Sequence, residues 1–202
     1  MMNVIEIGAN DGGHTFEFSK NSKVWSFEPD PSNIKILKDK FINNKNVVII
    51  EKAVNDFNGT ASFNVATNGM SSSLNDLTDF SINNTKVRFE NQINVDVVRM
   101  DTFIMENGID VIDYFHCDAQ GNDLKILHSF GNKLSLIKKG KVEVSFGEEL
   151  YKNVTNDLNS VVSFLKDNGF EISNWRDIND KLNKRYFDGN VEFFNKNYIN
   201  LI

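Results

Sequence analysis

Two acidic residues and a glycine-rich turn near the start of the chain have the types and spacing of a nucleoside-binding site. Glu6 and Gly8 open the pattern acid-x-Gly-x-x-x-Gly, which ends at Gly12 with Gly13 directly after it. Glu28 follows the next apolar run. A carboxylate can accept hydrogen bonds from two ribose hydroxyls, and glycines let the backbone approach a ligand closely. We therefore expect Glu28 to bind a ribose beside this turn.

The spacing of the glycines separates the cofactor classes. A dinucleotide turn reads G-x-G-x-x-G, and the second glycine counted from Gly8 is replaced by Asn10, which argues against NAD. No Gly-Lys-Ser/Thr follows, so the turn is not a P-loop. S-adenosylmethionine fits better: its ammonium would lie near Glu6, directly or through water, and its carboxylate near the helix start after Gly13. An ordinary strand-to-helix turn with a surface glutamate is the structural alternative.

The apolar pattern predicts alternating strands and helices to hold these residues. Short apolar runs predict strands of a sheet buried on both faces, and they lie at 4–7, 24–27, 47–50, 111–117 and 141–146. Amphipathic segments predict helices at 15–20, after an N-cap at Ser32, at 124–130 and at 158–165. Segments 170–172 and 191–194 are expected to form a closing antiparallel pair.

A long polar segment between two alternating segments is the expected substrate side. Period-two alternation at 60–65 and 93–99 predicts extra β structure around residues 69–94. A loop of that length without regular structure is usually functional or mobile. We expect residues 1–202 to form one domain, with an insertion at about 60–100 facing the substrate.

Composition excludes several classes of protein. The chain has 202 residues, a formal net charge of -6 and one cysteine, Cys117. A domain of this size needs no disulfide, a mild acidic charge argues against nucleic acid, and no apolar run reaches the roughly 20 residues of a membrane span. No Cys/His cluster predicts a metal, and the N-terminus shows no export signal, so we expect a cytoplasmic protein.

Five stretches of the sequence resemble the FkbM-type S-adenosylmethionine-dependent methyltransferases. They are Val4–Gly12, Phe27–Pro29, Gly69–Leu74, Val95–Asp101 and His116–Asp123. The resemblance covers nearly the whole chain, including the tail around Gly169 and residues 187–194. It implies an α/β class I methyltransferase fold with a Rossmann-like, mainly parallel seven-stranded sheet, helices on both faces and an extra β insertion. It also implies O-methylation of a sugar, glycan or other small molecule.

The chain departs from the family pattern at two places. Gln120 and Asp123 stand where the family usually has glutamates, which puts a charged role for residue 120 in doubt. The chain also begins almost directly at the first strand, without the helices that often cover the cofactor in this class. We therefore expect an open site or one closed by another subunit, as in a homo-oligomer.

Three residues are candidates for the methyl-transfer step. Asp118 follows the strand at 111–117, where it would hold the methionine ammonium or take a proton from the acceptor; we favour positioning, because in-line alignment supplies much of the acceleration. Its structural alternative is a helix cap. His116, on the same side of the strand, and His14, at the first helix, are the candidate bases, and a buried structural role is the favoured alternative for His116.

The remaining expected site residues bind the cofactor. Ala53 and Val54 are placed to pack on the adenine, and the resemblance puts Ser72 near the cofactor or acceptor. The expected cofactor-binding residues are Glu6, Gly8, Ala9, Asn10, Gly12, Gly13, Glu28, Pro29, Ala53, Val54, Ser72 and Asp118.

The sequence thus predicts a methyltransferase that uses S-adenosylmethionine to methylate a hydroxyl. Two alternatives stay open. One is a non-catalytic module or subunit that binds S-adenosylmethionine without turnover. The other is an NAD-dependent oxidoreductase, which requires a dinucleotide turn that accommodates Asn10.

Overall fold

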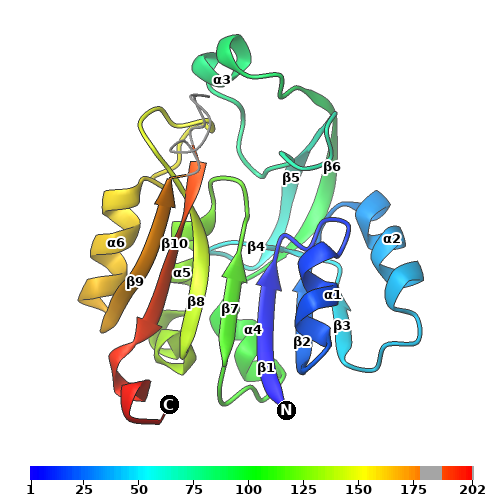
Figure 1. The fold of residues 1–202 in the computed structure, drawn as a ribbon. Helices are drawn as coiled ribbons and strands as arrows, with labels where there is room; N and C mark the ends of the chain where they lie inside the picture. Colours follow the sequence, from blue (N-terminus) through cyan, green and yellow to red (C-terminus); the bar gives the residue numbers. More distant parts are fainter. Residues whose placement is uncertain (178–187, 202) are drawn as a thin grey trace.

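A mostly parallel sheet of seven strands organises the chain in a computed structural model that describes residues 1–177 and 188–201 (Figure 1). The strands are β1 (Met2–Ile7), β2 (Ser22–Phe27), β3 (Val47–Ile50), β7 (Tyr114–Cys117), β8 (Lys139–Ser145), β9 (Phe170–Asp177) and β10 (Asp188–Asn195). Their order is β3-β2-β1-β7-β8-β10-β9, and β10 runs antiparallel to both of its neighbours. The expected α/β class, the mainly parallel sheet and the closing antiparallel pair are confirmed.

Helices cover both faces of the sheet (Figure 1). One face carries α1 (Gly13–Ser19) and α2 (Pro31–Phe41), which follow β1 and β2. The other face carries α4 (Met100–Glu106), α5 (Asp123–Ser129) and α6 (Leu158–Asp167). Crossovers between parallel strands are right-handed. The chain adds β2 and β3 on one side of β1 and β7 and β8 on the other, so the connecting helices lie on opposite faces of the sheet. Two 3-10 helices, Gly131–Leu136 and Lys196–Leu201, follow α5 and β10.

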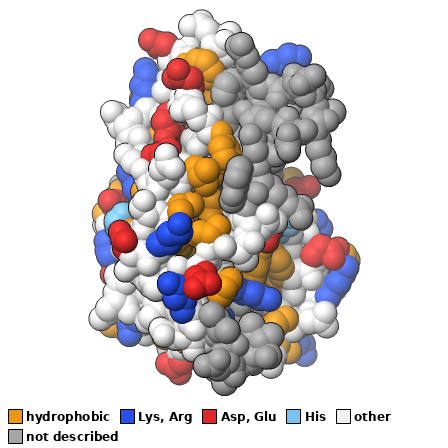
Figure 2. Space-filling view, turned by 60° about the vertical axis from the view of Figure 1, so that its left-hand side comes forward, with side chains coloured by type: hydrophobic (Ala, Val, Ile, Leu, Met, Phe, Trp, Pro, Cys, Tyr) orange, Lys and Arg blue, Asp and Glu red, His pale blue; other side chains and the backbone are white. Residues whose placement is uncertain are grey.

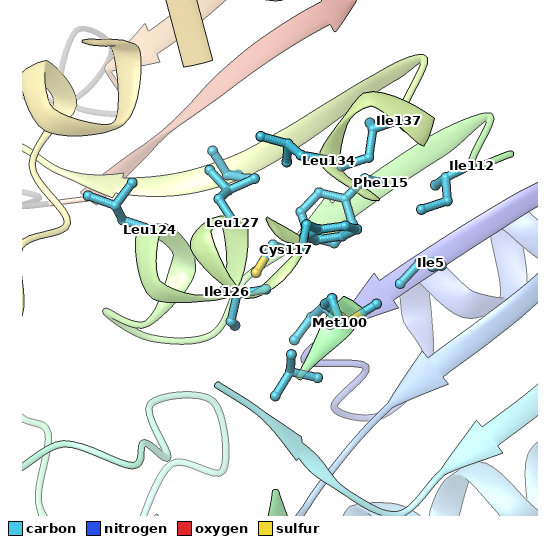
Figure 3. Packing of buried hydrophobic residues seen from close by; sticks show 14 of the residues in the cluster. Ile5, Met100, Ile112, Phe115, Cys117, Leu124, Ile126, Leu127, Leu134 and Ile137 are labelled. Carbon is cyan, nitrogen blue, oxygen red and sulfur yellow. The ribbon is translucent and has the colours of Figure 1, made fainter. Parts of the chain in front are cut away.

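The main hydrophobic core lies between the sheet and the second group of helices. Figure 3 shows Phe115 and Cys117 of β7 beside Ile126 and Leu127 of α5, with Met100 of α4 close by. All five side chains are fully buried. Side chains alternate along a strand, so Tyr114 and His116 of β7 point to the other face, where they contact Phe18 and His14 of α1.

The start of α2 differs from the prediction. Asp30, not Ser32, is the N-cap: its carboxylate accepts from the Ser32 N–H at 2.8 Å, and Pro31 occupies the first helical turn. Proline fits there because its fixed φ suits the helix and its missing N–H has no helical partner. The helix buries one apolar face, which consists of Ile34, Leu37 and Phe41.

The long polar segment between the alternating stretches has more structure than expected. A second sheet, in the order β4-β6-β5, consists of β4 (Ala53–Val54), β5 (Gly59–Ala66) and β6 (Phe89–Val98). The segment joining β5 to β6 contains α3 (Asp79–Asn84), so it is not a structureless loop. In Figure 1 these elements rise above the edge where β1 and β7 end. The extra β structure is therefore placed at the carboxyl ends of the parallel strands.

The visible surface carries charges of both signs. Figure 2 shows Lys and Arg side chains interspersed with Asp and Glu on the face turned forward, together with a band of hydrophobic side chains in the middle of the view. A nucleic-acid interface normally concentrates one sign of charge, and this face has no such concentration among its described residues. None of the helices in residues 1–177 and 188–201 is long and apolar enough to cross a membrane.

Candidate functional site

A cavity of about 630 Å³ opens at the carboxyl ends of β1, β2 and β7. In open α/β sheets ligands bind in this position, where the chain reverses its direction of travel across the sheet, here between β1 and β7. Most of the expected site residues line the cavity, namely Gly8, Ala9, Asn10, Gly13, His14, Glu28, Pro29, Ala53, Val54, Ser72, His116 and Asp118. The volume is within the range of cofactor sites, about 300–1,000 Å³.

Glu28 is held rigidly at one wall of the cavity. Its carboxylate accepts from the Asn10 N–H at 2.7 Å and from the Asp30 N–H at 2.9 Å, and it also hydrogen-bonds to the Asn33 side chain. A carboxylate has about four acceptor sites, so Glu28 keeps capacity for a ligand hydroxyl, and a second hydroxyl can replace Asn33. Burial has the largest effect on the pKa of Glu28 and raises it to about 7. The two backbone hydrogen bonds act in the opposite direction and lower the pKa. A ligand that donates to Glu28 would favour its ionised form.

The turn after β1 takes its shape from Gly8 and Asn10. Gly8 has φ 79, and a Cβ there would lie 2.1 Å from the Asp118 carbonyl oxygen, so this glycine lets the ends of β1 and β7 meet. Asn10 also adopts a left-handed conformation, with φ 48, which asparagine tolerates better than most residues. This explains how the turn forms with asparagine where a dinucleotide turn has glycine.

Two expected cofactor residues, Glu6 and Gly12, do not line the cavity. Glu6 is fully buried and accepts from Ser26 at 2.9 Å and from Thr15, while its other oxygen, Oε1, has no hydrogen-bond partner. Strand alternation points Glu6 toward α1, where Thr15 covers it. A Cβ on Gly12 would lie 2.7 Å from side-chain carbons of α2, so Gly12 serves the packing of two helices.

One N–H at the start of α1 already has a partner within the turn. The Gly13 N–H already donates to the Asp11 carboxylate at 3.0 Å. Gly13 therefore lines the cavity without offering its own N–H to a ligand.

His116 and His14 lie together at the cavity wall. Their ring centroids are 4.6 Å apart in an edge-on arrangement. Burial first, and then the charges of Lys141 and His14, lower the pKa of His116 to about 3, so its imidazole is neutral near pH 7. His116 Nδ1 is buried without a hydrogen-bond partner. A histidine with such a low pKa is a weak base, whereas His14 is exposed to the cavity.

Asp118 lies at the end of β7, beside a group of buried carboxyls. It is not the cap of α5, whose N-cap is Asn122. Burial first and then the Asp118 charge raise the pKa of Asp123 to about 7 and that of Asp188 to about 6. The pKa of Glu143 is raised well above its ordinary value by burial and by the Asp118, Asp123 and Asp188 charges. Burial and the Asp118 charge therefore favour the protonated, neutral form of the other carboxyls at this end of the cavity.

Sequence reasoning missed two residues that surround Asp118. Gln120 donates from Nε2 to Asp118 Oδ1 at 2.7 Å and lines the cavity. The Tyr151 hydroxyl donates to Gln120 Oε1 at 2.7 Å and lies 3.2 Å from the Ser71 carbonyl oxygen. Gln120 was visible in the sequence as a departure from a family motif, but Tyr151 carries no local signal because its partners are distant in sequence.

The remaining wall is largely apolar. Ala53 and Val54 are buried in β4, and Phe63 of β5 and Leu74 also line the cavity. Ser72 lines it too, but its hydroxyl already accepts from the Ala66 N–H at 2.9 Å. Flat apolar walls suit an aromatic base. Residues 1–177 and 188–201 contain no cluster of His, Cys, Asp or Glu arranged for a metal ion.

These features fit S-adenosylmethionine. The spare acceptor capacity of Glu28 suits a ribose, the apolar wall suits adenine, and the carboxyls around Asp118 suit the positive charges of the ammonium and sulfonium. The turn between Gly8 and Gly13 carries the acidic Asp11 and no basic residue that could bind phosphates. The residues present therefore match this cofactor better than a dinucleotide.

Comparison with known proteins gives the same assignment. Residues 6–172 match the sequence model of the methyltransferase FkbM domain. The 2-O-methyltransferase NoeI of Sinorhizobium fredii is 27% identical over 161 residues, which cover 74% of this chain and 65% of that protein. The chain thus spans less than two thirds of the length of this relative.

Solved structures share the fold. The methyltransferase FkbM of Methylobacillus flagellatus superposes with a TM-score of 0.60 at 15% identity, covering 96% of this chain and 43% of that one. A Streptococcus mutans protein solved in complex with SAH has a TM-score of 0.53 at 12% identity and covers 96% and 89%. At these identities the likeness establishes a class I methyltransferase fold.

Proposed function

Because the chain belongs to the FkbM methyltransferase family, whose cofactor is S-adenosylmethionine, we propose that it methylates a hydroxyl oxygen of a sugar, glycan or other small metabolite. One observation supports this proposal most directly: Glu28 and Asp118 lie on either side of the Gly8 turn, along the same wall of the cavity. Oxygen as the acceptor atom is supported by NoeI, a 2-O-methyltransferase. In this proposal residues 1–202 act as one domain, with the segment at about 60–100 on the substrate side.

Each wall of the cavity has a role in holding the cofactor. Glu28 accepts the two ribose hydroxyls, Ala53 and Val54 contact the adenine, and Asp118 faces the methionine ammonium. Gly8 and Asn10 shape the turn between them. Glu6 acts from behind this turn, through Thr15 and Ser26, rather than by direct contact.

The bound cofactor supplies a methyl group activated by a sulfonium leaving group. The chain aligns the acceptor oxygen with that methyl and excludes water, which contributes much of the acceleration in a two-reactant transfer. His14 is better suited than His116 to receive the acceptor proton, because burial leaves His116 with a pKa of about 3. Asp118 is the alternative proton acceptor at the same wall.

The charge of the cavity favours an uncharged acceptor. Its acidic lining residues are Asp11, Glu17, Glu28, Asp118 and Asp188. Lys52 is the one lysine or arginine among the described lining residues. A phosphate or carboxylate on the acceptor would be repelled at this wall. Hydroxyl-rich, uncharged molecules such as sugars are therefore better acceptors than nucleic acid.

Calorimetric titration with S-adenosylmethionine tests the proposal. We expect wild-type protein to bind S-adenosylmethionine and not NAD. Glu28→Ala should lose about 1.5–3 kcal/mol of binding free energy, as expected for hydrogen bonds to a charged group. Glu90→Ala, an exposed glutamate on β6 outside the cavity, is the matched control and should bind like wild type.

The outcomes separate the candidate functions. Absence of S-adenosylmethionine binding by the wild type would overturn the proposal for this chain. Binding without release of S-adenosylhomocysteine in the presence of sugar and glycan acceptors would favour a non-catalytic module.

A further inference from the structure

Gln120 connects four separate parts of the chain at the cavity. It lies in the turn from β7 to α5 with a left-handed backbone, φ 49, which is unfavourable for a residue with a Cβ. Its carbonyl oxygen accepts from the Ser73 hydroxyl at 2.8 Å. Its side chain contacts Asp118, Glu143 on β8 and Tyr151. These contacts hold Gln120 in a backbone conformation that is otherwise unfavourable. We conclude that its side chain has a fixed position.

The partners of Gln120 determine which way its amide points. Nε2 lies 2.7 Å from Asp118 Oδ1 and 3.2 Å from Glu143 Oε2, and the Asp118 carboxylate needs a donor. Oε1 lies 2.7 Å from the hydroxyl of Tyr151, which donates to it. A flipped amide would place its oxygen against Asp118. Tyr151 therefore fixes the amide in the orientation that donates to Asp118.

A neutral donor at this position suits the charges around it. Asp123, Glu143 and Asp188 are close enough to Asp118 for its charge to raise their pKa values. A glutamate at position 120 would add a further carboxyl and could donate to Asp118 only while protonated. Glutamine donates at every pH, and so it orients Asp118 without adding repulsion.

We propose that Gln120 is a positioning residue that holds the Asp118 carboxylate toward the cofactor ammonium, and that Tyr151 locks Gln120 in place. This inference rests on the proposed function, in which Asp118 faces that ammonium. Gln120 acts through Asp118 and needs no contact with the cofactor itself.

Two ligands distinguish positioning of Asp118 from general support of the fold. S-Adenosylmethionine carries the ammonium, whereas 5′-methylthioadenosine has the same nucleoside without the amino-acid portion. We expect Gln120→Ala to weaken S-adenosylmethionine binding about tenfold and Tyr151→Phe about threefold, as for loss of one hydrogen bond. Neither variant should change the affinity for 5′-methylthioadenosine. Phenylalanine retains the ring that packs on Gly121, so only the hydroxyl is lost.

A double-mutant cycle tests whether Gln120 acts through Asp118. Asp118→Asn alone should weaken S-adenosylmethionine binding, and adding Gln120→Ala should cause little further loss. Asn132→Ala is the matched control, because Asn132 carries an exposed side-chain amide outside the cavity. It should leave both affinities unchanged.

Different experimental results would contradict the role of Gln120 and the proposed function. Wild-type protein that binds neither ligand contradicts the proposed function. If Asp118→Asn weakens S-adenosylmethionine binding while Gln120→Ala does not, the inference about Gln120 alone is overturned. A Gln120→Ala variant that loses affinity for both ligands equally also overturns it, because that result indicates only structural support.

Discussion

Glu6 should make the folded protein less stable as the pH rises, and Glu6→Gln should reduce that dependence. The side chain is fully buried, and burial, opposed by the hydroxyls of Thr15 and Ser26, raises its pKa from 4.5 to about 7. Between these two values the folded state binds more protons than the unfolded chain. Stability therefore falls as the pH rises through this window and stays reduced above it.

The size of the effect follows from the pKa of Glu6. At about 1.4 kcal/mol for each pKa unit, a rise from 4.5 to about 7 corresponds to about 3.5 kcal/mol. Roughly 2 kcal/mol of this falls between about pH 5.5 and about pH 8.5, because the unfolded carboxyl is already mostly ionised at the lower pH. Glutamine has no proton to lose, and its amide oxygen can still accept from Thr15 and Ser26.

Urea denaturation followed by tryptophan fluorescence across this pH range measures the difference. Between about pH 5.5 and about pH 8.5 the wild type should lose roughly 2 kcal/mol more stability than Glu6→Gln. Other buried carboxyls affect the pH dependence of stability equally in both proteins, so their effects largely cancel in the difference. Glu90→Gln, at an exposed position, should follow the wild type. Equal pH slopes for Glu6→Gln and wild type would refute the reasoning, since they would mean that Glu6 is hydrated in the folded protein.

Two further predictions concern the turn after β1 and the ribose site. Gly8→Ala should destabilise the fold by at least about 2 kcal/mol in urea denaturation, because the new Cβ meets the Asp118 carbonyl oxygen and the backbone is left-handed; an alanine variant as stable as wild type would contradict this. S-Adenosylmethionine affinity should rise with pH up to about 7, by at most about tenfold per pH unit, because ribose hydroxyls favour the ionised form of Glu28. Calorimetry at several pH values should show a flatter profile for Glu28→Gln, and an unchanged profile would contradict the ribose assignment.

Local patterns in the sequence were sufficient for most of the sheet and for the turn that lines the cavity. The apolar runs that became β1, β2 and β3 are short and separated by amphipathic segments, so their identity does not depend on distant contacts. The helix α4 was missed, although Met100, Phe103 and Ile104 have helical spacing and are buried. With only seven residues, this helix depends on core packing more than on its own propensity.

The polar side of the site was harder to predict because it depends on contacts between distant segments. Glu6 is turned away from the cavity because Thr15 and Ser26 close over it, and nothing in the local sequence shows that closure. Tyr151 reaches Gln120 across 31 residues of sequence. Motif spacing placed Glu28 and Asp118 on the cavity wall, but it could not show which residues orient them.

The close backbone contact between Gly8 and Asp118 links the stability of the sheet to ligand binding. The Asp118 N–H donates to the Ile7 carbonyl oxygen at 3.1 Å, so the ends of β1 and β7 form one continuous backbone edge below the cavity. The Asp118 charge at this edge disfavours the ionisation of both Glu143 and Asp188. A cofactor that brings an ammonium and a sulfonium lowers this repulsion. Part of its binding free energy therefore comes from relief of repulsion already present in the free protein, and the same relief stabilises the folded state.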